Sequence, residues 1–554
     1  MRRKPLIVLK FGGSVLGNAD ALTGVVHEIY RWRREGWRVL AVVSALAGRT
    51  DALGTVCHSI APRLDGCAEA GVRALGELEC AALLSAHLDR AGVPASVVHP
   101  ATIGLRAVGD ALDATPAAVD APALHRALDR DGVVVVPGYA ALDREDRVVT
   151  LGRGGSDLSA LFLASALGAA RCRLVKDVDG LYDRDPKLPG AHRYGASSFA
   201  DALATDGTIV QHKAVRWARA RGLAFEIGDL QCVRPTVVWS GPSRYAASIR
   251  LDRPQTVALL GLGTVGGGVA AHLRDMPDAF EVIGVAVWDA ARRRDDVTIP
   301  LTADAVGLAS SGADIVVEAM GGVEAALAAV CAALEAGSDV VTANKSLIAT
   351  HGRNLVRLAR LQGRRLLYSA AVGGSAPVVE RACAGGVVSV RGVLNGTANF
   401  VLERMAAGAA FDDALVEART LGLAEADAAR DLDGRDAADK ARALALAMGL
   451  PAPQVERWCA SPRERTGGRM RQVVRLDGDG ASVGFEPVAP DDSLFDLPEE
   501  WNCAVLQRDD GAVEVVRGRG AGRWPTAESV LGDLLELHRE RVALAAGVRE
   551  VAHA

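Results

Sequence analysis

The stretch Thr256-Val-Ala-Leu-Leu-Gly-Leu-Gly-Thr-Val-Gly-Gly-Gly268 lies near the middle of the 554-residue chain. An apolar run, 256–260, leads into Gly261, Gly263 and Gly266 with the spacing G-x-G-x-x-G, and a helical pattern follows. This order is typical of a dinucleotide-binding βαβ unit, whose glycines permit the turn, the approach of a pyrophosphate and close helix–strand packing. Unpaired N–H groups at the start of the helix would face the phosphates. Such a unit normally opens a domain, so the roughly 250 residues before it are expected to form a complete domain of their own.

Composition narrows the class of protein. A hydrophobic fraction of 49% is ample for buried cores, and the length is enough for about two to four domains. A net charge of -5 gives no reason to expect nucleic acid or an anionic membrane as partner. No apolar run approaches the roughly 18 residues of a membrane span. Nine cysteines without a C-x-x-C pair argue against a disulfide framework or a zinc site. We therefore expect a soluble cytoplasmic protein.

Lysine is rare in this chain. Seven of the 63 basic residues are lysines: Lys4, Lys10, Lys176, Lys187, Lys213, Lys345 and Lys440. Arginine is a fixed fork that keeps its proton, whereas lysine is a compact point charge with a tunable pKa. Each remaining lysine is therefore a candidate for chemistry that arginine cannot do. The alternative, survival by chance, fits Lys4 near the terminus.

Residues 1–235 read as an α/β domain with a mainly parallel sheet, because strand-like runs alternate with helical patterns. The strand-like runs are 6–9, 38–44, 96–99, 133–137, 148–151, 171–175 and 223–227, and the helical patterns are 22–34, 72–91, 123–131, 156–167 and 214–220. Two glycine turns carry charge, Gly152-Arg-Gly-Gly-Ser-Asp157 and the stretch 176–187. The first would cradle an anion beside a carboxylate. Taken alone, either turn fits a solvated surface loop equally well, and there is no P-loop motif.

Together these segments resemble aspartokinase, of the amino-acid kinase family. The matching pieces are Lys10-Phe-Gly-Gly-Ser14, Val43-Ser-Ala45, Thr50-Asp51, Gly76-Glu77, Thr150-Leu-Gly-Arg-Gly-Gly-Ser-Asp157, Lys176-Asp-Val-Asp-Gly-Leu-Tyr182 and Asp185-Pro186. They lie in the family's order and span most of residues 5–228. The resemblance implies phosphorylation of the side-chain carboxylate of aspartate by ATP with Mg²⁺.

The resemblance also implies residue roles. Lys10 would stabilise the transferring phosphoryl group, and Asp157 would organise the site. The substrate would be held by Ser14, Thr50, Glu77 and Arg153, and the nucleotide by Lys176, Asp177, Tyr182 and Lys187.

This half departs from the family in two positions and in one missing module. Val15 stands where a second serine is usual, and Ile209 stands where the family has a lysine that meets ATP. Lys213, one turn on, is the nearest replacement. The segment 229–255 is too short for the regulatory ACT-type modules that usually follow, so we expect no feedback inhibition through them.

In the second half, candidate residues follow strand-like runs. Asp289 ends the run 281–287 and favours the ribose hydroxyls of NAD, whereas the arginines 292–294 favour the 2′-phosphate of NADP, so both cofactors stay open. Lys345 follows the run 339–341, at the strand end where ligands bind. If Asp436 starts a helix, Lys440 lies one turn on, on the same face. A plain surface ion pair is the alternative.

This half resembles homoserine dehydrogenase. The matching pieces are Gly261–Gly266, Glu318-Ala-Met-Gly-Gly322, Val340-Val-Thr-Ala-Asn-Lys345, Val372-Gly-Gly374 with Pro377, Gly392-Val-Leu-Asn-Gly-Thr397, Glu425 with Asp427, Asp431-Leu-Asp-Gly-Arg-Asp-Ala437 with Lys440, and Gly518-Arg-Gly-Ala-Gly522 with Pro525-Thr-Ala527. They cover almost all of 256–545. The resemblance implies reduction of aspartate semialdehyde to homoserine by NADPH or NADH.

The implied catalytic residues are Lys440 as proton donor, Lys345 beside it and Asp436. Glu425, Asp431 and Asp436 would bind the substrate. The cofactor would be held by Gly261, Gly263, Thr264, Val265, Gly266, Asp289, Thr342, Lys345, Gly422 and Gly522. A monovalent cation would be held by the backbone carbonyls of Val372, Gly374 and Ala376. Ser369 replaces the usual acidic residue there, and a neutral hydroxyl is a weaker cation ligand.

The predicted organisation is a three-layer αβα amino-acid-kinase domain (1–235), a linker (236–254), a Rossmann domain (255–375), an α+β catalytic and dimerisation domain (376–515) and a segment returning to the Rossmann domain (516–554). The predicted function is a fused aspartokinase–homoserine dehydrogenase of threonine and methionine biosynthesis, at least dimeric, acting on small-molecule substrates. One alternative is a dehydrogenase with a kinase-like interaction domain. Another is a specialised-metabolism enzyme that acts on an aspartate analogue.

Overall fold

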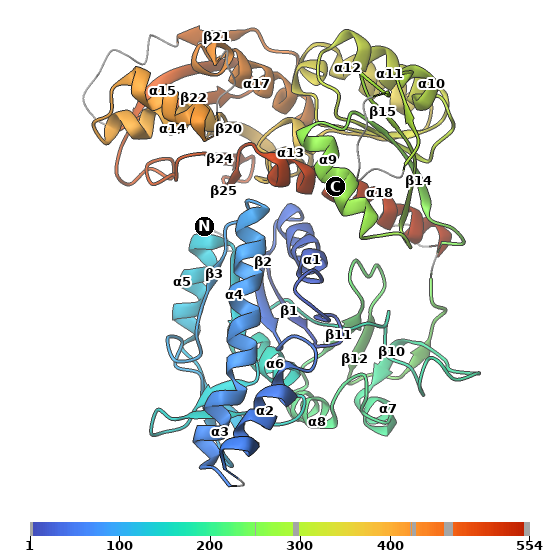
Figure 1. Ribbon diagram of the computed structural model, residues 1–554, viewed down its shortest axis with the longest axis vertical. Helices are drawn as coiled ribbons and strands as arrows, with labels where there is room; N and C mark the ends of the chain where they lie inside the picture. The colour runs from blue at the N-terminus through green and yellow to red at the C-terminus, as the bar shows by residue number, and fades with distance from the viewer. Residues whose placement is uncertain are drawn as a thin grey trace. The chain divides into compact units, whose positions relative to one another are not determined.

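The computed structural model describes residues 4–61, 63–249, 251–291, 299–421, 423, 428–458 and 469–547 (Figure 1). The chain forms two compact units. The N-terminal unit consists of Arg3–Asp89 and Pro94–Arg250, and the C-terminal unit is formed chiefly by Leu251–Ala554. In the described part of the chain, no helix is long and apolar enough to cross a membrane.

A nine-stranded sheet forms the core of the N-terminal unit, in the order β13-β10-β12-β11-β9-β1-β2-β6-β3. Its strands are β1 (Leu6–Phe11), β2 (Arg38–Val43), β3 (Ser96–Val97), β6 (Val133–Pro137), β9 (Arg171–Val175), β10 (Tyr194–Ser198), β11 (Phe225–Gly228), β12 (Thr236–Trp239) and β13 (Arg244–Tyr245). The central β1 pairs in parallel with β2 and β9, and all six of its residues are buried. Burial on both faces explains why these strands read as continuous apolar runs, and it confirms the predicted layered α/β fold.

The helices of this unit are α1 (Leu22–Arg34), α2 (Arg49–Ile60), α3 (Gly66–Arg73), α4 (Leu75–Arg90), α5 (Ala121–Asp131), α6 (Gly155–Leu167), α7 (Phe199–Ala204) and α8 (His212–Arg221). A second, four-stranded sheet has the order β5-β4-β7-β8, with β4 (Arg106–Val108), β5 (Thr115–Ala118), β7 (Ala140–Leu142) and β8 (Val148–Thr150). The run 148–151 therefore belongs to this small sheet and not to the main parallel one. The segment 236–254, expected to be a linker, begins with β12 and β13, which complete the nine-stranded sheet.

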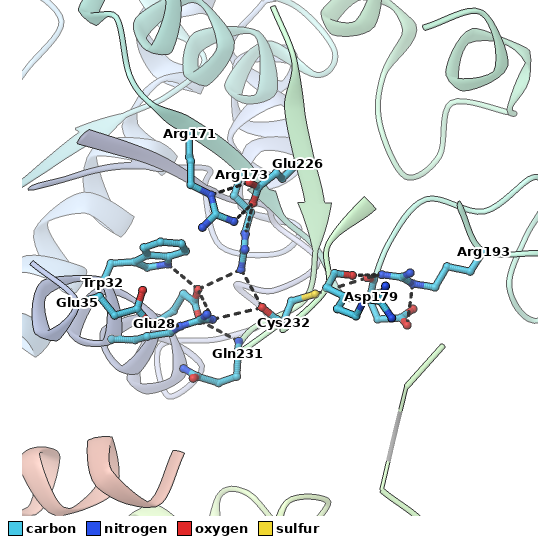
Figure 2. A network of polar contacts seen from close by, with 12 residues as sticks. Glu28, Trp32, Glu35, Arg171, Arg173, Asp179, Arg193, Glu226, Gln231 and Cys232 are labelled. Atoms are coloured by element: carbon cyan, nitrogen blue, oxygen red, sulfur yellow. Dashed lines mark hydrogen bonds and ion pairs between the residues drawn. The ribbon is translucent and has the colours of Figure 1, made fainter. Parts of the chain in front are cut away.

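A buried polar network fastens α1 to this sheet (Figure 2). Glu28 accepts hydrogen bonds from the Trp32 indole N–H and the Gln231 backbone N–H, each at 2.9 Å. Arg173 on β9 pairs with Glu226 on β11 at 2.9 Å. The network thus joins a helix, two strands and the loop after β11 through charges that are paired inside the protein, as buried charges must be.

The C-terminal unit opens with a parallel six-stranded sheet in the order β16-β15-β14-β17-β18-β19. Its strands are β14 (Gln255–Leu260), β15 (Phe280–Ala286), β16 (Leu301–Thr302), β17 (Ile315–Glu318), β18 (Asp339–Thr342) and β19 (Leu366–Leu367), and its helices include α9 (Thr264–Arg274), α10 (Ala305–Ala309), α11 (Glu324–Glu335) and α12 (Lys345–Leu361). The predicted strand–glycine turn–helix is confirmed. Gly261 has φ +102°, and a Cβ on Gly266 would lie 2.0 Å from the carbonyl oxygen of Gly261. A Cβ on Gly263 would meet nothing within 4 Å, so its backbone is open to a ligand.

A second six-stranded sheet follows, in the order β21-β23-β22-β20-β24-β25. It contains β20 (Val387–Val393), β21 (Val455–Trp458), β22 (Arg469–Leu476), β23 (Ala481–Val488), β24 (Trp501–Arg508) and β25 (Val513–Arg519), with helices α13 (Val378–Cys383), α14 (Gly396–Ala406), α15 (Phe411–Thr420), α16 (Ala429–Leu432) and α17 (Arg435–Ala447). The last helix, α18 (Arg523–Ala545), packs beside α9, with Ala527 and Val530 in one core with Val257 of β14 (Figure 1). The chain therefore returns to the Rossmann-type sheet, as predicted.

Candidate functional sites

The first candidate site is a pair of lysines sharing one aspartate. Lys10 lies on β1, Lys176 directly follows the neighbouring β9, and Asp157 lies in the first turn of α6. The Lys10 ammonium is 2.8 Å from one oxygen of Asp157, and the Lys176 ammonium is 2.9 Å from the other. Lys10 is 5% exposed and Asp157 3%. Residues from three elements thus place two cations around one buried carboxylate.

Burial and mutual charge tune these groups. Burial lowers the pKa of Lys10 to about 8, although Asp157 acts in the opposite direction. Burial alone would raise the pKa of Asp157, but Lys10 and Lys176 outweigh it and bring the pKa to about 2. Asp157 therefore stays ionised at neutral pH, and Lys10 stays mostly protonated, as a cation that can pair with an incoming anion.

These groups open into a cavity of about 870 Å³. Six of the ten predicted kinase residues line it: Lys10, Thr50, Glu77, Arg153, Asp157 and Lys176. The other four, Ser14, Asp177, Tyr182 and Lys187, are not among its lining residues. Gly152 and Gly154, with φ +71° and +74°, shape the turn that brings Gly155–Asp157 to the cavity as the start of α6. Backbone N–H groups at this helix start suit an anionic group.

Hydrogen bonds and an ion pair to Asp179 fix Tyr182 and the turn after Lys176. The Tyr182 hydroxyl donates to Asp179 at 2.8 Å. Arg193 binds the other Asp179 oxygen at 3.0 Å (Figure 2). Ser248 donates to that same oxygen at 2.7 Å. Asp179 thus fixes the turn that the sequence assigned to the nucleotide.

Glu77 is a buried acid at the cavity. It is 3% exposed, and burial raises its pKa to about 7. Within the described structure its Oε2 has no hydrogen-bond partner. A buried carboxyl oxygen without a donor is costly unless a ligand supplies one, and an ammonium group would do so.

Ile209 lines the cavity, as the sequence departure implied. Lys213, the expected replacement, has its ammonium engaged by Asp113, Ala114 and Leu151 and is not among the lining residues. It therefore does not take the place of the missing cation.

The second candidate site joins three of the predicted residues of the C-terminal unit. Asp436 and Lys440 lie one turn apart on α17 and pair at 2.8 Å, which confirms the predicted helical spacing. Lys345, the first residue of α12 after β18, binds the other Asp436 oxygen at 2.5 Å. Lys440 is 8% exposed and also donates to the Leu394 carbonyl at 2.5 Å. The surface ion pair considered as an alternative is therefore wrong for Lys440.

Charge pairing sets the ionisation of this group. Burial would raise the pKa of Asp436, but Lys440 and Lys345 outweigh burial and lower it. Burial would lower the pKa of Lys345, but Asp436 outweighs it and raises the value. Asp431 has less compensation, and burial raises its pKa. The centre thus holds two cations and one firmly ionised carboxylate.

Asn395 belongs to this site and was missed from the sequence. Its Nδ2 donates to Asp431 at 2.8 Å and to Asp436 at 2.9 Å, while its Oδ1 caps α14 by accepting the N–H of Ala398. The only available signal was its place in the Asn-Gly-Thr string, which was matched as a motif without a role.

The expected cofactor residues occupy the carboxyl edge of the parallel sheet. Thr342 ends β18 and donates to the buried Glu318 at 2.5 Å, and Glu318 also accepts the N–H of Met320 at 2.9 Å. Thr264 and Asp289 are exposed, Val265 is partly buried, and Gly522, with φ +118°, precedes α18. Gly422, Glu425 and the arginines 292–294 lie outside the described residues.

The loop predicted for a monovalent cation is internally bonded. The Ala376 carbonyl accepts the N–H of Val378 at 2.7 Å, and Ser369 supplies a hydroxyl where a carboxylate was expected. The Ser369 N–H is itself bound by Asp533 at 3.1 Å. Of the expected cation ligands, the Ala376 carbonyl is therefore already engaged, and the neutral hydroxyl of Ser369 is a weaker ligand than a carboxylate.

Both units thus carry a lysine–carboxylate centre at a sheet edge, and the second lies on a dinucleotide-type fold. This combination defines a nucleotide-dependent enzyme with two sites. Three families match the chain: the amino acid kinase family over residues 5–228, the homoserine dehydrogenase NAD binding domain over 261–369, and homoserine dehydrogenase over 377–535.

Homoserine dehydrogenase from Neisseria gonorrhoeae is 34% identical over 52% of this chain and 73% of its own length. The Corynebacterium glutamicum homoserine dehydrogenase is 35% identical, covering 52% and 72%. A Thermus thermophilus aspartokinase is 32% identical over 40% of this chain and 56% of its own length. A solved homoserine dehydrogenase from Thiobacillus denitrificans has 32% identity and a TM-score of 0.48, covering 53% of this chain and 75% of that one. The chain belongs to the homoserine dehydrogenase family and carries an amino acid kinase domain before it.

Proposed function

We propose that this chain is a bifunctional enzyme of the aspartate pathway. One site phosphorylates the side-chain carboxylate of L-aspartate with ATP, giving 4-phospho-L-aspartate. The other reduces L-aspartate 4-semialdehyde to L-homoserine with NADH or NADPH. The observation that carries the proposal is that each unit buries a lysine beside an ionised aspartate, in the domain type that each chemistry needs.

In the kinase site, the protein's task is to place and neutralise charge, because phosphoryl transfer needs little covalent help. Lys10 stabilises the phosphoryl group as it moves to the aspartate carboxylate, and Asp157 holds Lys10 and Lys176 in position. The glycine turn supplies backbone N–H groups. Glu77 binds the aspartate ammonium, and Arg153 pairs with a carboxylate. Ser14 and Thr50 contribute hydroxyls to the substrate, and Asp177, Tyr182 and Lys187 lie on the nucleotide side.

Mg²⁺ is proposed to accompany ATP. Among the described residues no group of three or more His, Cys, Asp or Glu side chains is arranged to hold a metal ion. Both oxygens of Asp157 are already engaged by lysines, so the ion is assigned to the phosphates and no step is routed through it.

In the dehydrogenase site, the nicotinamide supplies the hydride when it is bound. Lys440 donates a proton to the carbonyl oxygen as the alcohol forms, and Asp436 orients Lys440 and keeps Lys345 charged nearby. Asp431 and Asp436, fixed by Asn395, hold the polar end of the substrate. Gly261, Gly263 and Gly266 bring the backbone close to the pyrophosphate. No step uses a monovalent cation, because the Ala376 carbonyl already accepts the Val378 N–H and Ser369 offers a hydroxyl in place of a carboxylate.

The finer assignments are also proposals. Both NAD and NADP are proposed as cofactors, because Asp289 favours NAD whereas the arginines 292–294 favour NADP. The enzyme is proposed to be cytoplasmic, at least dimeric and part of threonine and methionine biosynthesis. Since its two reactions are not consecutive, a separate reductase must convert the phosphate to the semialdehyde.

A paired assay tests both activities. Aspartate-dependent ATP turnover is measured for the full-length protein and for Lys10→Ala, and homoserine oxidation is measured with NAD and with NADP. We expect turnover that Lys10→Ala abolishes, and homoserine oxidation in both proteins. Equal ATP turnover in the two proteins would refute the kinase proposal, and no oxidation with either cofactor would refute the dehydrogenase.

A further inference from the structure

Lys213 binds two segments of the N-terminal unit, residues 113–114 and Leu151, with one ammonium group. It lies in the first turn of α8, and its Nζ is 2.5 Å from Oδ1 of Asp113, 3.0 Å from the carbonyl of Ala114 and 2.9 Å from that of Leu151. An ammonium has three N–H donors, so these three oxygens use its capacity fully. Lys213 is thus a structural cross-brace and leaves no donor for a ligand.

The first segment that it holds directly follows β8 and directly precedes the glycine turn 152–155. Leu151 is the residue that precedes this turn. The Asp113 carboxylate lies against the turn itself, because a Cβ on Gly152 would be 1.9 Å from its Oδ1. The Ala114 N–H also donates to the carbonyl of Thr150 at 2.9 Å. The Asp113–Ala114 turn and the glycine turn therefore share one bonding centre.

The start of α8 also touches the glycine turn from a second point. A Cβ on Gly154, whose φ is +74°, would lie 2.4 Å from Cβ of Gln211. Gln211 is in turn held by a hydrogen bond from its Nε2 to the Gly207 carbonyl at 2.9 Å. The glycine turn runs on into Gly155–Asp157, and Asp157 binds Lys10 and Lys176. A shift of α8 would therefore reach the two lysines through four residues of chain.

We propose that Lys213, together with Asp113, is a positioning residue of the kinase reaction. Lys213 fixes the glycine turn in the position in which the N–H groups of the turn and Asp157 can contact the substrate. This inference rests on the proposed kinase function. It also explains why lysine was kept at this position, since a planar guanidinium cannot point three donors at three converging oxygens. Lys213 thus acts through the turn and not on the nucleotide.

Lys213→Met in the full-length protein is the test. Arg216→Met is the matched control, because Arg216 is exposed on the same helix. Rates are measured at varied ATP and aspartate. We expect kcat of the kinase to fall by about ten- to a hundredfold in Lys213→Met, because misplaced groups cost that much. Lys213→Arg should have a kcat nearly as low as that of Lys213→Met. Asp113→Asn keeps an acceptor for Lys213, so its kcat should fall less. Homoserine oxidation by the same molecules should be unchanged.

A second measurement separates this inference from the proposed function. Hydrogen exchange of the backbone amides in 152–157 should be faster in Lys213→Met than in Arg216→Met, whether or not the wild type phosphorylates aspartate. Should Lys213→Met not fold, Asp113→Asn replaces it in both measurements. Unchanged exchange in 152–157 together with unchanged kinase constants would overturn the positioning role. Absent kinase turnover in the wild type, with faster exchange in the variant, would refute the proposed function and leave the cross-brace standing.

Discussion

The buried acid at the kinase cavity makes stability depend on pH in a way that can be worked out. Glu77 has its pKa raised by burial from the ordinary 4.5 to about 7. A difference of about 2.5 between folded and unfolded states, at about 1.4 kcal/mol per pKa unit, is worth about 3 kcal/mol. As pH rises above 4.5, the unfolded chain releases this proton first. The contribution of Glu77 to the stability of the N-terminal unit should therefore fall between pH 4.5 and 7 and stay level above pH 7.

Glu77→Gln removes this titration. The variant should match the wild type near pH 5 and be more stable at pH 8 by up to about 3 kcal/mol. Stability of the N-terminal unit is read from urea-dependent hydrogen exchange of residues 75–90 in the full-length protein. Glu79→Gln is the control, because Glu79 is an exposed neighbour on α4. A wild-type advantage over Glu77→Gln at pH 8, or a difference that is the same at both pH values, would refute the reasoning.

The same acid should shape kinase activity. If ionised Glu77 binds the aspartate ammonium, kcat/KM for aspartate rises as pH passes about 7, and it falls above about 8 as Lys10 loses its proton. With these two pKa values, only about six tenths of the molecules would have Glu77 ionised and Lys10 protonated at the optimal pH. A flat profile across pH 6–9 would contradict both assignments.

Three further predictions concern the dehydrogenase unit. Gly266→Ala puts a Cβ 2.0 Å from the Gly261 carbonyl, so NADPH affinity measured by fluorescence titration should fall more than about tenfold, and unchanged affinity would count against the fingerprint. Lys440→Arg keeps the charge but is expected to lower kcat by at least about a hundredfold, because guanidinium does not give up its proton; near-normal steady-state turnover would exclude proton donation by Lys440. Asn395→Ala removes the donor to Asp431 and Asp436, which should raise both pKa values and move the acid limb of the homoserine pH profile upward; an unmoved limb would show that Asn395 serves only as a helix cap.

Most of the features that could be predicted from the sequence depend on local patterns of residues. The glycine spacing at 261–266 and the turn-by-turn pairing of Asp436 with Lys440 depend on residues a few positions apart, so their geometry follows from the chain itself. The long apolar strands were found for the same reason. The helix α2 was missed because it buries only Leu53, Gly54 and Cys57 and shows little apolar periodicity.

Contacts between segments that are distant in the sequence could not be predicted from it. Lys345 meets Asp436 only because the end of β18 and the start of α17 lie close together, and no local sequence pattern near either residue predicts this contact. The partners of Lys213 include two backbone carbonyls, which have no sequence signature. The short strands β12 and β13 looked like a connecting segment, since pairing with β11 and β10 is what gives them order.

The order in which the ribosome delivers the chain has a consequence for α18. The N-terminal unit has all of its strands by residue 245, so it is free to mature while translation continues. The dinucleotide fold begins at β14 but is sealed by Ala527, Val530 and Leu534, which emerge more than 250 residues later. Until α18 has been synthesised, the apolar side of β14 is not covered by these three side chains. Nascent chains stalled before residue 523 should therefore attract chaperones at the second unit, while their kinase unit is already resistant to protease.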